Sequence, residues 1–188
     1  MKIGFAMCGS FCTFAAAFEQ MTLLRDEGHE IVPIMSFNAS KIDTRFGRSS
    51  AHISRAEAIS DRKPIITIED AEPLGPAEKL DLLIICPCTG NTLAKLAAGI
   101  TDTPVTMAAK AHLRCDRPLL IALATNDGLS ANLSNINAML KRKGVYFLPM
   151  RQDDPIKKPH SLVADFDRIE EAVAAALRCE QLRPLFIE

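Results

Sequence analysis

Neither sign of charge dominates this sequence, and it contains no long apolar run. Its 188 residues include 22 Lys and Arg against 23 Asp and Glu, which gives a formal net charge of −1. A chain without a positive field does not attract a nucleic-acid backbone or an anionic membrane, so the composition argues against general nucleic-acid binding. No apolar segment approaches the roughly 18–20 residues of a membrane span, and residues 1–11 turn polar too early for a signal peptide. We expect a cytoplasmic protein.

Several patterns that define common sites are also missing. The dinucleotide fingerprint G-x-G-x-x-G is absent, and Met35 and Ser36 stand where such folds place an acidic residue for the ribose. The hydrolase nucleophile elbow G-x-S-x-G is absent as well. Four of the six cysteines have C-x-C or C-x3-C spacing, which matches the common zinc patterns poorly. We therefore expect free thiols in a reducing compartment and no bound metal.

What the sequence does have is a regular alternation of strand-like and helix-like segments. Residues 2–7 and 30–35 are short apolar runs, and apolar residues recur at helical spacing in the segment 13–27 between them. Further strands are predicted at 65–68, 82–86, 119–123 and 145–148. Further helices are predicted at 50–60, from residue 92, and at 103–113, 129–140 and 165–177. We expect capping by Thr13 and Asp165, helix ends at Gly28 and Gly144, and a proline-rich loop at 149–160.

This alternation predicts one α/β domain over residues 1–188. Its architecture would be a doubly wound parallel sheet with right-handed crossovers, a three-layer sandwich of the flavodoxin-like or Rossmann-like kind. If the strand order is 3-2-1-4-5, the order reverses between the first and fourth strands. The loops at 8–13 and 86–92 then face one another, and ligands bind at such a point.

These loops carry groups suited to a mononucleotide such as FMN. The turn at 8–13 offers a glycine, hydroxyls and backbone N–H groups at a helix N-terminus, and the hydroxyl of Ser36 suits a phosphate monoester. Segment 87–92 supplies an amide and hydroxyls for a flat heterocycle, with a glycine that permits close approach. Each segment also has a simpler explanation as a structural turn or a helix cap, and so does the turn at 125–128.

The segment 86–106 carries a specific resemblance. Its letters, C-P-C-T-G-N-T-L-A-K-L-A-A-G-I-T-D-T-P-V-T, resemble the flavin-binding segment P-x-x-A-N-T-x-A-K-x-A-x-G-I-A-D of the homo-oligomeric flavin-containing cysteine decarboxylase superfamily. Within that superfamily the chain is most similar to the B subunits of dipicolinate synthases. The similarity covers nearly the whole chain and includes the segments 43–47, 71–76, 107–114, 125–127 and 152–159.

The resemblance implies FMN binding and assigns residues to it. The residues that would hold the phosphate are Gly9, Ser10 and Ser36. Those that would border the flavin ring and the substrate are Thr89, Gly90, Asn91 and Thr92, and Asn126 is retained from a P-A-M-N segment of the superfamily. Because superfamily members assemble as trimers or larger rings with flavin at subunit contacts, the resemblance also implies a homo-oligomer.

Three departures from the superfamily limit this transfer. The superfamily decarboxylases carry a catalytic histidine in the loop after the third strand, whereas residues 69–76 contain none, and His52 lies too early to align. The P-A-M-N segment becomes Leu-Ala-Thr-Asn at 123–126. Gly90 replaces the usual alanine of A-N-T. Decarboxylation is therefore disfavoured.

The resemblance also implies a reaction and a partner. The B subunit works with a second chain of dipicolinate synthase, the A subunit, which binds a nicotinamide cofactor, here NADP. Together they oxidise a dihydrodipicolinate-type precursor to the dipicolinate made in the mother cell during sporulation. A small dicarboxylate substrate requires fixed cations, best of all arginine. The candidates that flank the proposed site are Arg45, Arg48, Lys110 and Arg114, although each also fits a solvated surface charge.

Three functions remain open from the sequence. The first is a flavin-binding oxidoreductase subunit, which the intact Asn91-Thr92 pair favours. The second is a non-catalytic binding subunit that completes the active site of the partner, which the missing histidine favours. The third and least favoured is an FMN-dependent decarboxylase. All three share one fold, so the fold does not separate them.

Overall fold

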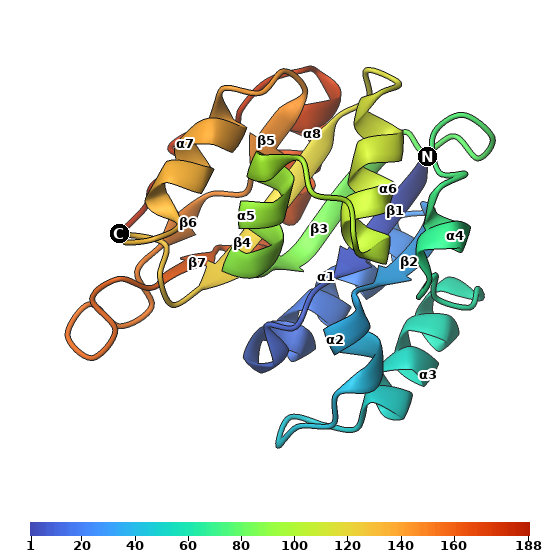
Figure 1. The fold of residues 1–188 in the computed structure, drawn as a ribbon, viewed down its shortest axis with the longest axis horizontal. Coiled ribbons are helices and arrows are strands. Elements are labelled where there is room, and N and C mark those ends of the chain that lie inside the picture. The colour runs from blue at the N-terminus through green and yellow to red at the C-terminus, as the bar shows by residue number, and fades with distance from the viewer.

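The computed structural model describes residues 1–188 and builds them around one seven-stranded sheet (Figure 1). The strands are β1 (Lys2–Met7), β2 (Glu30–Met35), β3 (Leu82–Cys88), β4 (Leu119–Thr125), β5 (Val145–Phe147), β6 (Met150–Arg151) and β7 (Leu162–Ala164). Their order is β2-β1-β3-β4-β7-β6, and β5 pairs with the first half of β4. The five strands β1 to β5 run parallel, as the sequence predicts.

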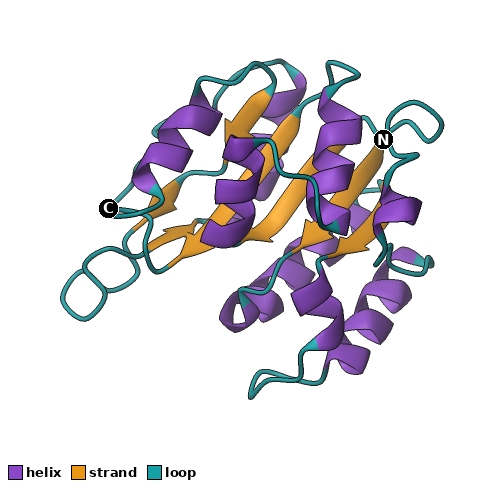
Figure 2. Ribbon diagram, in the orientation of Figure 1, coloured by secondary structure: helices purple, strands orange, loops and turns teal.

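Helices cover both faces of this sheet (Figure 2). They are α1 (Phe14–Asp26), α2 (Phe37–Lys41), α3 (Ser49–Ser60), α4 (Ile68–Ala71), α5 (Gly90–Ala98), α6 (Pro104–Leu113), α7 (Leu133–Leu140) and α8 (Ile169–Leu177). One buried cluster packs α1, α3 and α8 against one face, and a second packs α4, α5, α6 and α7 against the other. The predicted three-layer α/β class is thus confirmed. None of these helices combines the length and the apolar character needed to cross a bilayer.

The predicted strand at 65–68 is wrong. Only Ile65 joins the sheet, through a single bridge to Ile34, and Ile68 already begins α4. The hydroxyl of Thr67 accepts a hydrogen bond from the N–H of Asp70 and caps this helix. The acidic side chains of Glu69 and Asp70 then lie in the first turn, where the helix dipole favours negative charge. These local capping signals outweigh the β-branched run.

The parallel sheet has an antiparallel extension that the sequence analysis did not predict, so the whole sheet is mixed. β7 runs antiparallel to the end of β4, and β6 runs antiparallel to β7. Residues 150–151 therefore lie in a strand and not in the predicted loop at 149–160. In β7 the side chains of Leu162 and Ala164 are buried on either side of the partly exposed Val163, which is the alternation of a strand with one buried face.

Four predicted helix ends also differ in the structure. The hydroxyl of Thr13 donates to the carbonyl of Ser10 and does not cap α1, and Asp165 makes no capping bond because a 3-10 turn at Phe166–Arg168 precedes α8. The helix predicted at 129–140 begins only at Leu133, after a turn in which the carbonyl of Asp127 accepts two backbone N–H groups. It ends at Leu140, four residues before Gly144. Only Gly28, with φ of +85°, stands at the end of its helix as expected, immediately after the C-cap residue Glu27 of α1.

The predicted reversal of strand order is confirmed. β1 lies between β2 and β3, so the loops that follow β1 and β3 leave the sheet side by side. The N–H of Cys8 donates to the carbonyl of Pro87 at 3.0 Å, and the hydroxyl of Thr92 donates to Cys8 Sγ at 3.3 Å. These bonds join the two loops directly at the carboxyl edge of the parallel strands.

His112 gives the fold a predicted pH dependence. Its ring is fully buried on α6, Nε2 donates to the carbonyl of Pro118 at 2.8 Å, and burial lowers the pKa of the ring to about 4. The ring in the unfolded chain has a pKa of about 6.5, so the unfolded state takes up the proton first and stability is lost as pH falls from about 6.5 towards about 4. Between about pH 7 and about pH 5, we expect the native chain to lose about 2 kcal/mol more unfolding free energy than His112→Gln.

Urea unfolding of both chains at the two pH values measures this difference. The matched control is His160→Gln, because the side chain of His160 lies in solvent. Equal losses in the native chain and in His112→Gln would contradict the prediction.

Candidate functional site

Two adjoining hollows lie at the carboxyl edge of the parallel strands, and we call them together the edge hollow. They have volumes of about 170 and about 320 Å³ and share Gly9, Thr89 and Asn91. Every residue that the sequence assigns to the cofactor lines one or both of them: Gly9, Ser10, Ser36, Thr89, Gly90, Asn91, Thr92 and Asn126. Four separate segments of the chain therefore meet at one place.

The turn after β1 presents unpaired backbone donors to the edge hollow. No carbonyl of the chain accepts the N–H groups of Gly9, Phe11 or Cys12, since this turn opens into the 3-10 turn Phe11–Thr13 and then α1. The first N–H groups of a helix are free in this way and favour an anion. A Cβ on Gly9 would lie 3.3 Å from Asn38 Cβ, so the backbone itself forms the floor here. This is the part of the hollow that fits a phosphate.

Ser36 reaches the same hollow from the end of β2. It is buried, and its hydroxyl accepts a hydrogen bond from the N–H of Ala39 at 3.2 Å, which caps α2. The sequence analysis did not predict this five-residue helix. Ser36 therefore has a structural role beside the assigned one, and its hydroxyl proton is the part that stays available to an anionic oxygen.

Thr89 and Thr92 are held in a chain of hydrogen bonds at the start of α5. The Thr89 hydroxyl accepts the N–H of Thr92 at 3.2 Å and donates to the Thr92 hydroxyl at 3.1 Å. The Thr92 hydroxyl in turn donates to Cys8 Sγ. The helix-cap explanation of this segment is correct for Thr89. Asn91 is exposed beside them, so its amide remains the group of this segment best placed to contact a ligand.

Gly90 packs against a cluster of three side chains between the last residue of β4 and the start of α7. The carboxylate of Asp127 accepts hydrogen bonds from the Thr125 hydroxyl and, at 2.9 Å, from Asn132 Nδ2. A Cβ on Gly90 would lie 2.5 Å from Thr125 Oγ1, 2.8 Å from Asp127 Oδ1 and in steric overlap with Asn132 Nδ2. Two of the departures from the superfamily, the glycine at 90 and the threonine at 125, are therefore linked by one contact.

The sequence analysis missed Lys95 and Asp102, which line the smaller hollow. Lys95 Nζ lies 2.9 and 2.8 Å from the two carboxylate oxygens of Asp102. This hydrogen bond lowers the pKa of Asp102. Both residues occupy lettered positions of the flavin-segment pattern, so the pattern itself contained the signal.

The four basic residues assigned to the substrate do not line the edge hollow of a single chain. Arg45 lies over the ring of Phe46 in the loop between α2 and α3, which projects from the body of the protein (Figure 1), and Arg48 precedes α3. Lys110 lines a different hollow of about 220 Å³, and Arg114 pairs with Glu72 at 3.1 Å. Their assignment to the substrate remains a prediction.

No histidine lines the edge hollow. The segment 69–76 forms α4 and the turn after it, on the side of the sheet covered by α6. His52 is buried on α3, with its ring centre 4.8 Å from that of Phe14 and with no partner for Nε2, and burial lowers the pKa of the ring. An acid–base histidine is therefore absent from the position where the superfamily decarboxylases have one.

All six cysteines are free thiols. Cys8, Cys86 and Cys88 are buried next to the edge hollow, and burial raises the pKa of each, to about 11 for Cys8. They remain protonated near neutral pH, which disfavours both nucleophilic attack and metal ligation. No group of three His, Cys, Asp or Glu side chains is arranged to hold a metal ion.

Comparison with known proteins gives the family of the chain. The family model described as Flavoprotein matches residues 1–178. The dipicolinate synthase B subunit of Bacillus subtilis (strain 168) is 42% identical over 187 residues, covering 100% of this chain and 94% of that protein. The crystal structure of the dipicolinate synthase B subunit from Bacillus halodurans has a TM-score of 0.91 at 39% identity, covering 100% of this chain and 96% of that one.

A more distant structure shares the fold. The FMN-dependent cysteine decarboxylase SpaF has a TM-score of 0.70 at 24% identity, with coverage of 95% of both chains. The chain therefore belongs to the Flavoprotein family and, within it, to the family of dipicolinate synthase B subunits.

Proposed function

We propose that this chain binds FMN in the edge hollow and, with the nicotinamide-binding A subunit of dipicolinate synthase, oxidises a dihydrodipicolinate-type precursor to dipicolinate. One observation carries the proposal: all eight residues assigned to the cofactor meet where the order of the strands reverses. The membership in the Flavoprotein family and the FMN dependence of SpaF support the choice of flavin. We place NADP on the A subunit, and the reaction in the cytoplasm of a sporulating mother cell.

The residues of the edge hollow fit the two ends of FMN. The free N–H groups of Gly9 and Phe11, with the hydroxyls of Ser10 and Ser36, suit the phosphate. The amides of Asn91 and Asn126 suit the polar edge of a flat ring. When bound, FMN supplies an acceptor for the hydride that leaves as the substrate ring becomes aromatic.

The chain itself orients the substrate and offers one place for the proton released in the oxidation. Two carboxylates line the edge hollow, and that of Asp102 is paired with Lys95. Asp127 has no cationic partner, and Thr125 and Asn132 hold its carboxylate in place. We therefore assign the role of proton acceptor to Asp127.

The second candidate function is a binding subunit that completes the active site of the partner chain. The hydroxyls of Thr89 and Thr92 are already engaged, and no histidine lines the edge hollow. In this case the edge hollow binds the substrate and the partner chain supplies the redox chemistry. A homo-oligomer with the edge hollow at subunit contacts is part of both proposals, and it would let basic residues such as Arg45 reach the site of a neighbouring chain.

Titration of the purified chain with FMN tests the proposal. We expect a stoichiometric flavin absorption band, and about tenfold or greater weakening in Ser10→Ala and Asn91→Ala, because each loses a hydrogen bond to a charged or polar part of the ligand. The matched control is Asn137→Ala, an exposed asparagine on α7 away from the hollow. Oxidation is then assayed with and without the A subunit. If the chain does not bind FMN but the two subunits together still oxidise the precursor, the binding-subunit function is favoured.

A further inference from the structure

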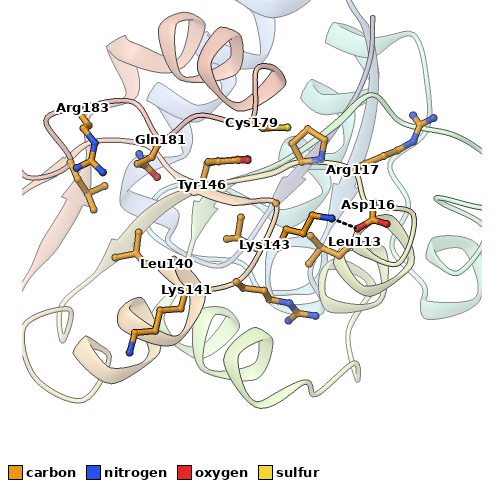
Figure 3. Close-up of a pocket in the computed structure, with 15 residues that line it drawn as sticks. Leu113, Asp116, Arg117, Leu140, Lys141, Lys143, Tyr146, Cys179, Gln181 and Arg183 are labelled. Atoms are coloured by element: carbon orange, nitrogen blue, oxygen red, sulfur yellow. Dashed lines mark hydrogen bonds and ion pairs between the residues drawn. The ribbon is translucent and has the colours of Figure 1, made fainter.

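A second hollow, larger than the edge hollow, lies at the opposite end of the parallel strands, where β4 and β5 begin. It has a volume of about 730 Å³, against about 320 Å³ for the larger part of the edge hollow. It forms between the end of α6, the turn before β5 and the C-terminal segment 179–185 (Figure 3). Small-molecule sites have volumes of about 300–1,000 Å³, so this hollow is large enough to enclose an organic ligand.

Part of the wall of this hollow is apolar and carries one aromatic hydroxyl. Leu113, Pro118, Val145 and Leu185 line it, and the ring of Tyr146 crosses its middle (Figure 3). Burial raises the pKa of Tyr146, so its hydroxyl keeps its proton and is able to donate a hydrogen bond. Such walls favour a ligand with an apolar or aromatic body.

Positive charge surrounds the hollow. Five cations and one acid line it: Arg117, Lys141, Arg142, Lys143, Arg183 and Asp116. The acid pairs with Lys143 at 3.3 Å, but both side chains are more than 80% exposed, so this pair contributes little. A hollow lined by one sign of charge concentrates ligands of the opposite sign.

Three of the five cations have no acidic partner. Arg117 donates to the carbonyl of Leu80 and lies 3.6 Å from Asp81, so its charge is partly balanced. Arg142 has only a weak contact, at 3.4 Å, with the carbonyl of Leu96. Lys141 and Arg183 line the hollow and form no ion pair. None of these residues lines the edge hollow, which lies at the carboxyl ends of the parallel strands.

We propose that this hollow, which we call the tyrosine hollow, binds a small organic anion with an aromatic body and at least two negative charges. The body would contact Tyr146 and Pro118, and the charged groups would face Lys141, Arg142 and Arg183. An aromatic dicarboxylate and a nucleoside monophosphate share this chemistry. The site is separate from the edge hollow, so it does not depend on the proposed function.

Tyr146 is the only tyrosine of the chain, which makes it a selective reporter. Incorporation of 3-fluorotyrosine gives a single fluorine NMR signal from the tyrosine hollow. We expect dipicolinate or AMP to shift this signal in a saturable manner, and the arm that saturates identifies the source of the ligand. Inorganic phosphate, which has charge without an aromatic body, is expected to produce no saturable shift.

Cys179 provides an independent readout with an internal control. It lines the tyrosine hollow, whereas the similarly exposed Cys12 follows β1 beside the edge hollow. We expect the ligand to slow alkylation of Cys179 by iodoacetamide, followed by peptide mass spectrometry, and to leave Cys12 unchanged. Equal protection of both thiols would overturn the assignment to this hollow.

Charge reversal locates the binding site. The double variant Lys141→Glu/Arg183→Glu should weaken binding about tenfold or more, and the control Lys63→Glu/Lys157→Glu reverses two exposed charges away from the hollow. All four side chains are exposed, so the variants should fold, which circular dichroism checks. The proposal is overturned if neither ligand shifts the fluorine signal at concentrations up to about 10 mM. A Kd of that size corresponds to a binding free energy of only about −3 kcal/mol. Equal binding by both double variants would overturn it too.

Discussion

Gly90→Ala is expected to destabilise the protein by about 2 kcal/mol and to weaken FMN binding at least tenfold. The added methyl group would overlap Asn132 Nδ2 and lie 2.5 Å from Thr125 Oγ1. These atoms cannot turn away freely, because both side chains bond the carboxylate of Asp127. The cluster must open, and the edge hollow that Gly90 and Asp127 line changes its shape. Urea unfolding and FMN titration measure the two effects.

A double-mutant cycle tests this explanation directly. Asn132→Ala removes the nearest obstacle, so the methyl group at position 90 should cost at least about 1 kcal/mol less in that background. Gly28→Ala is the control for a methyl group in open space, since no atom lies within 4 Å of the added Cβ and only the φ of +85° opposes it. If Gly90→Ala costs the same with and without Asn132, the steric account fails.

Gly75→Ala should destabilise the protein by at least about 3 kcal/mol. Gly75 has φ of +129°, and a Cβ there would overlap the carbonyl oxygen of Ala111 and lie 2.8 Å from its carbon. The obstacle is the backbone of α6, which is unable to rotate away as a side chain does. The turn after α4, closed by the hydrogen bond from the N–H of Gly75 to the carbonyl of Glu78, must therefore separate from α6.

Urea unfolding monitored by circular dichroism measures this loss. The exposed neighbour Ala77 provides the matched site: Ala77→Ser changes the same turn without approaching α6. FMN binding of any folded Gly75→Ala should stay near that of the native chain, because Gly75 does not line the edge hollow. A loss below about 1 kcal/mol would show that the two segments are not held as closely as described.

The sheet was predictable to the extent that its signals are local. The buried runs at 82–86 and 119–123 lie within β3 and β4, because parallel strands covered on both faces are apolar throughout. The strand predicted at 65–68 is wrong because a second local signal competes with its β-branched residues. The hydroxyl of Thr67 caps a helix that begins at Ile68, inside the predicted strand. The strands β6 and β7 have two and three residues, which is too short for a pattern. They form because β7 pairs with the end of β4 and β6 pairs with β7.

The edge hollow was predictable as a set of loops but not as a set of contacts. The reversal of strand order places the turns after β1 and β3 together, and this follows from the order of elements alone. The contact between Gly90 and Asp127 joins residues 37 positions apart, and only the packing of α5 against the loop after β4 brings them together. The ion pair of Lys95 with Asp102 is closer in sequence, but it still requires the turn between α5 and α6.

The sequence by itself determined the α/β class, the position of the ligand-binding edge and the family resemblance, because periodicity, caps and motif letters are properties of neighbouring residues. The tertiary structure alone decided which hydroxyls are already engaged, why residue 90 is glycine and where the tyrosine hollow lies. These depend on distances between segments that the chain order leaves open. Burial and hydrogen bonding across the sheet fix them, since close packing admits only one arrangement of each side chain.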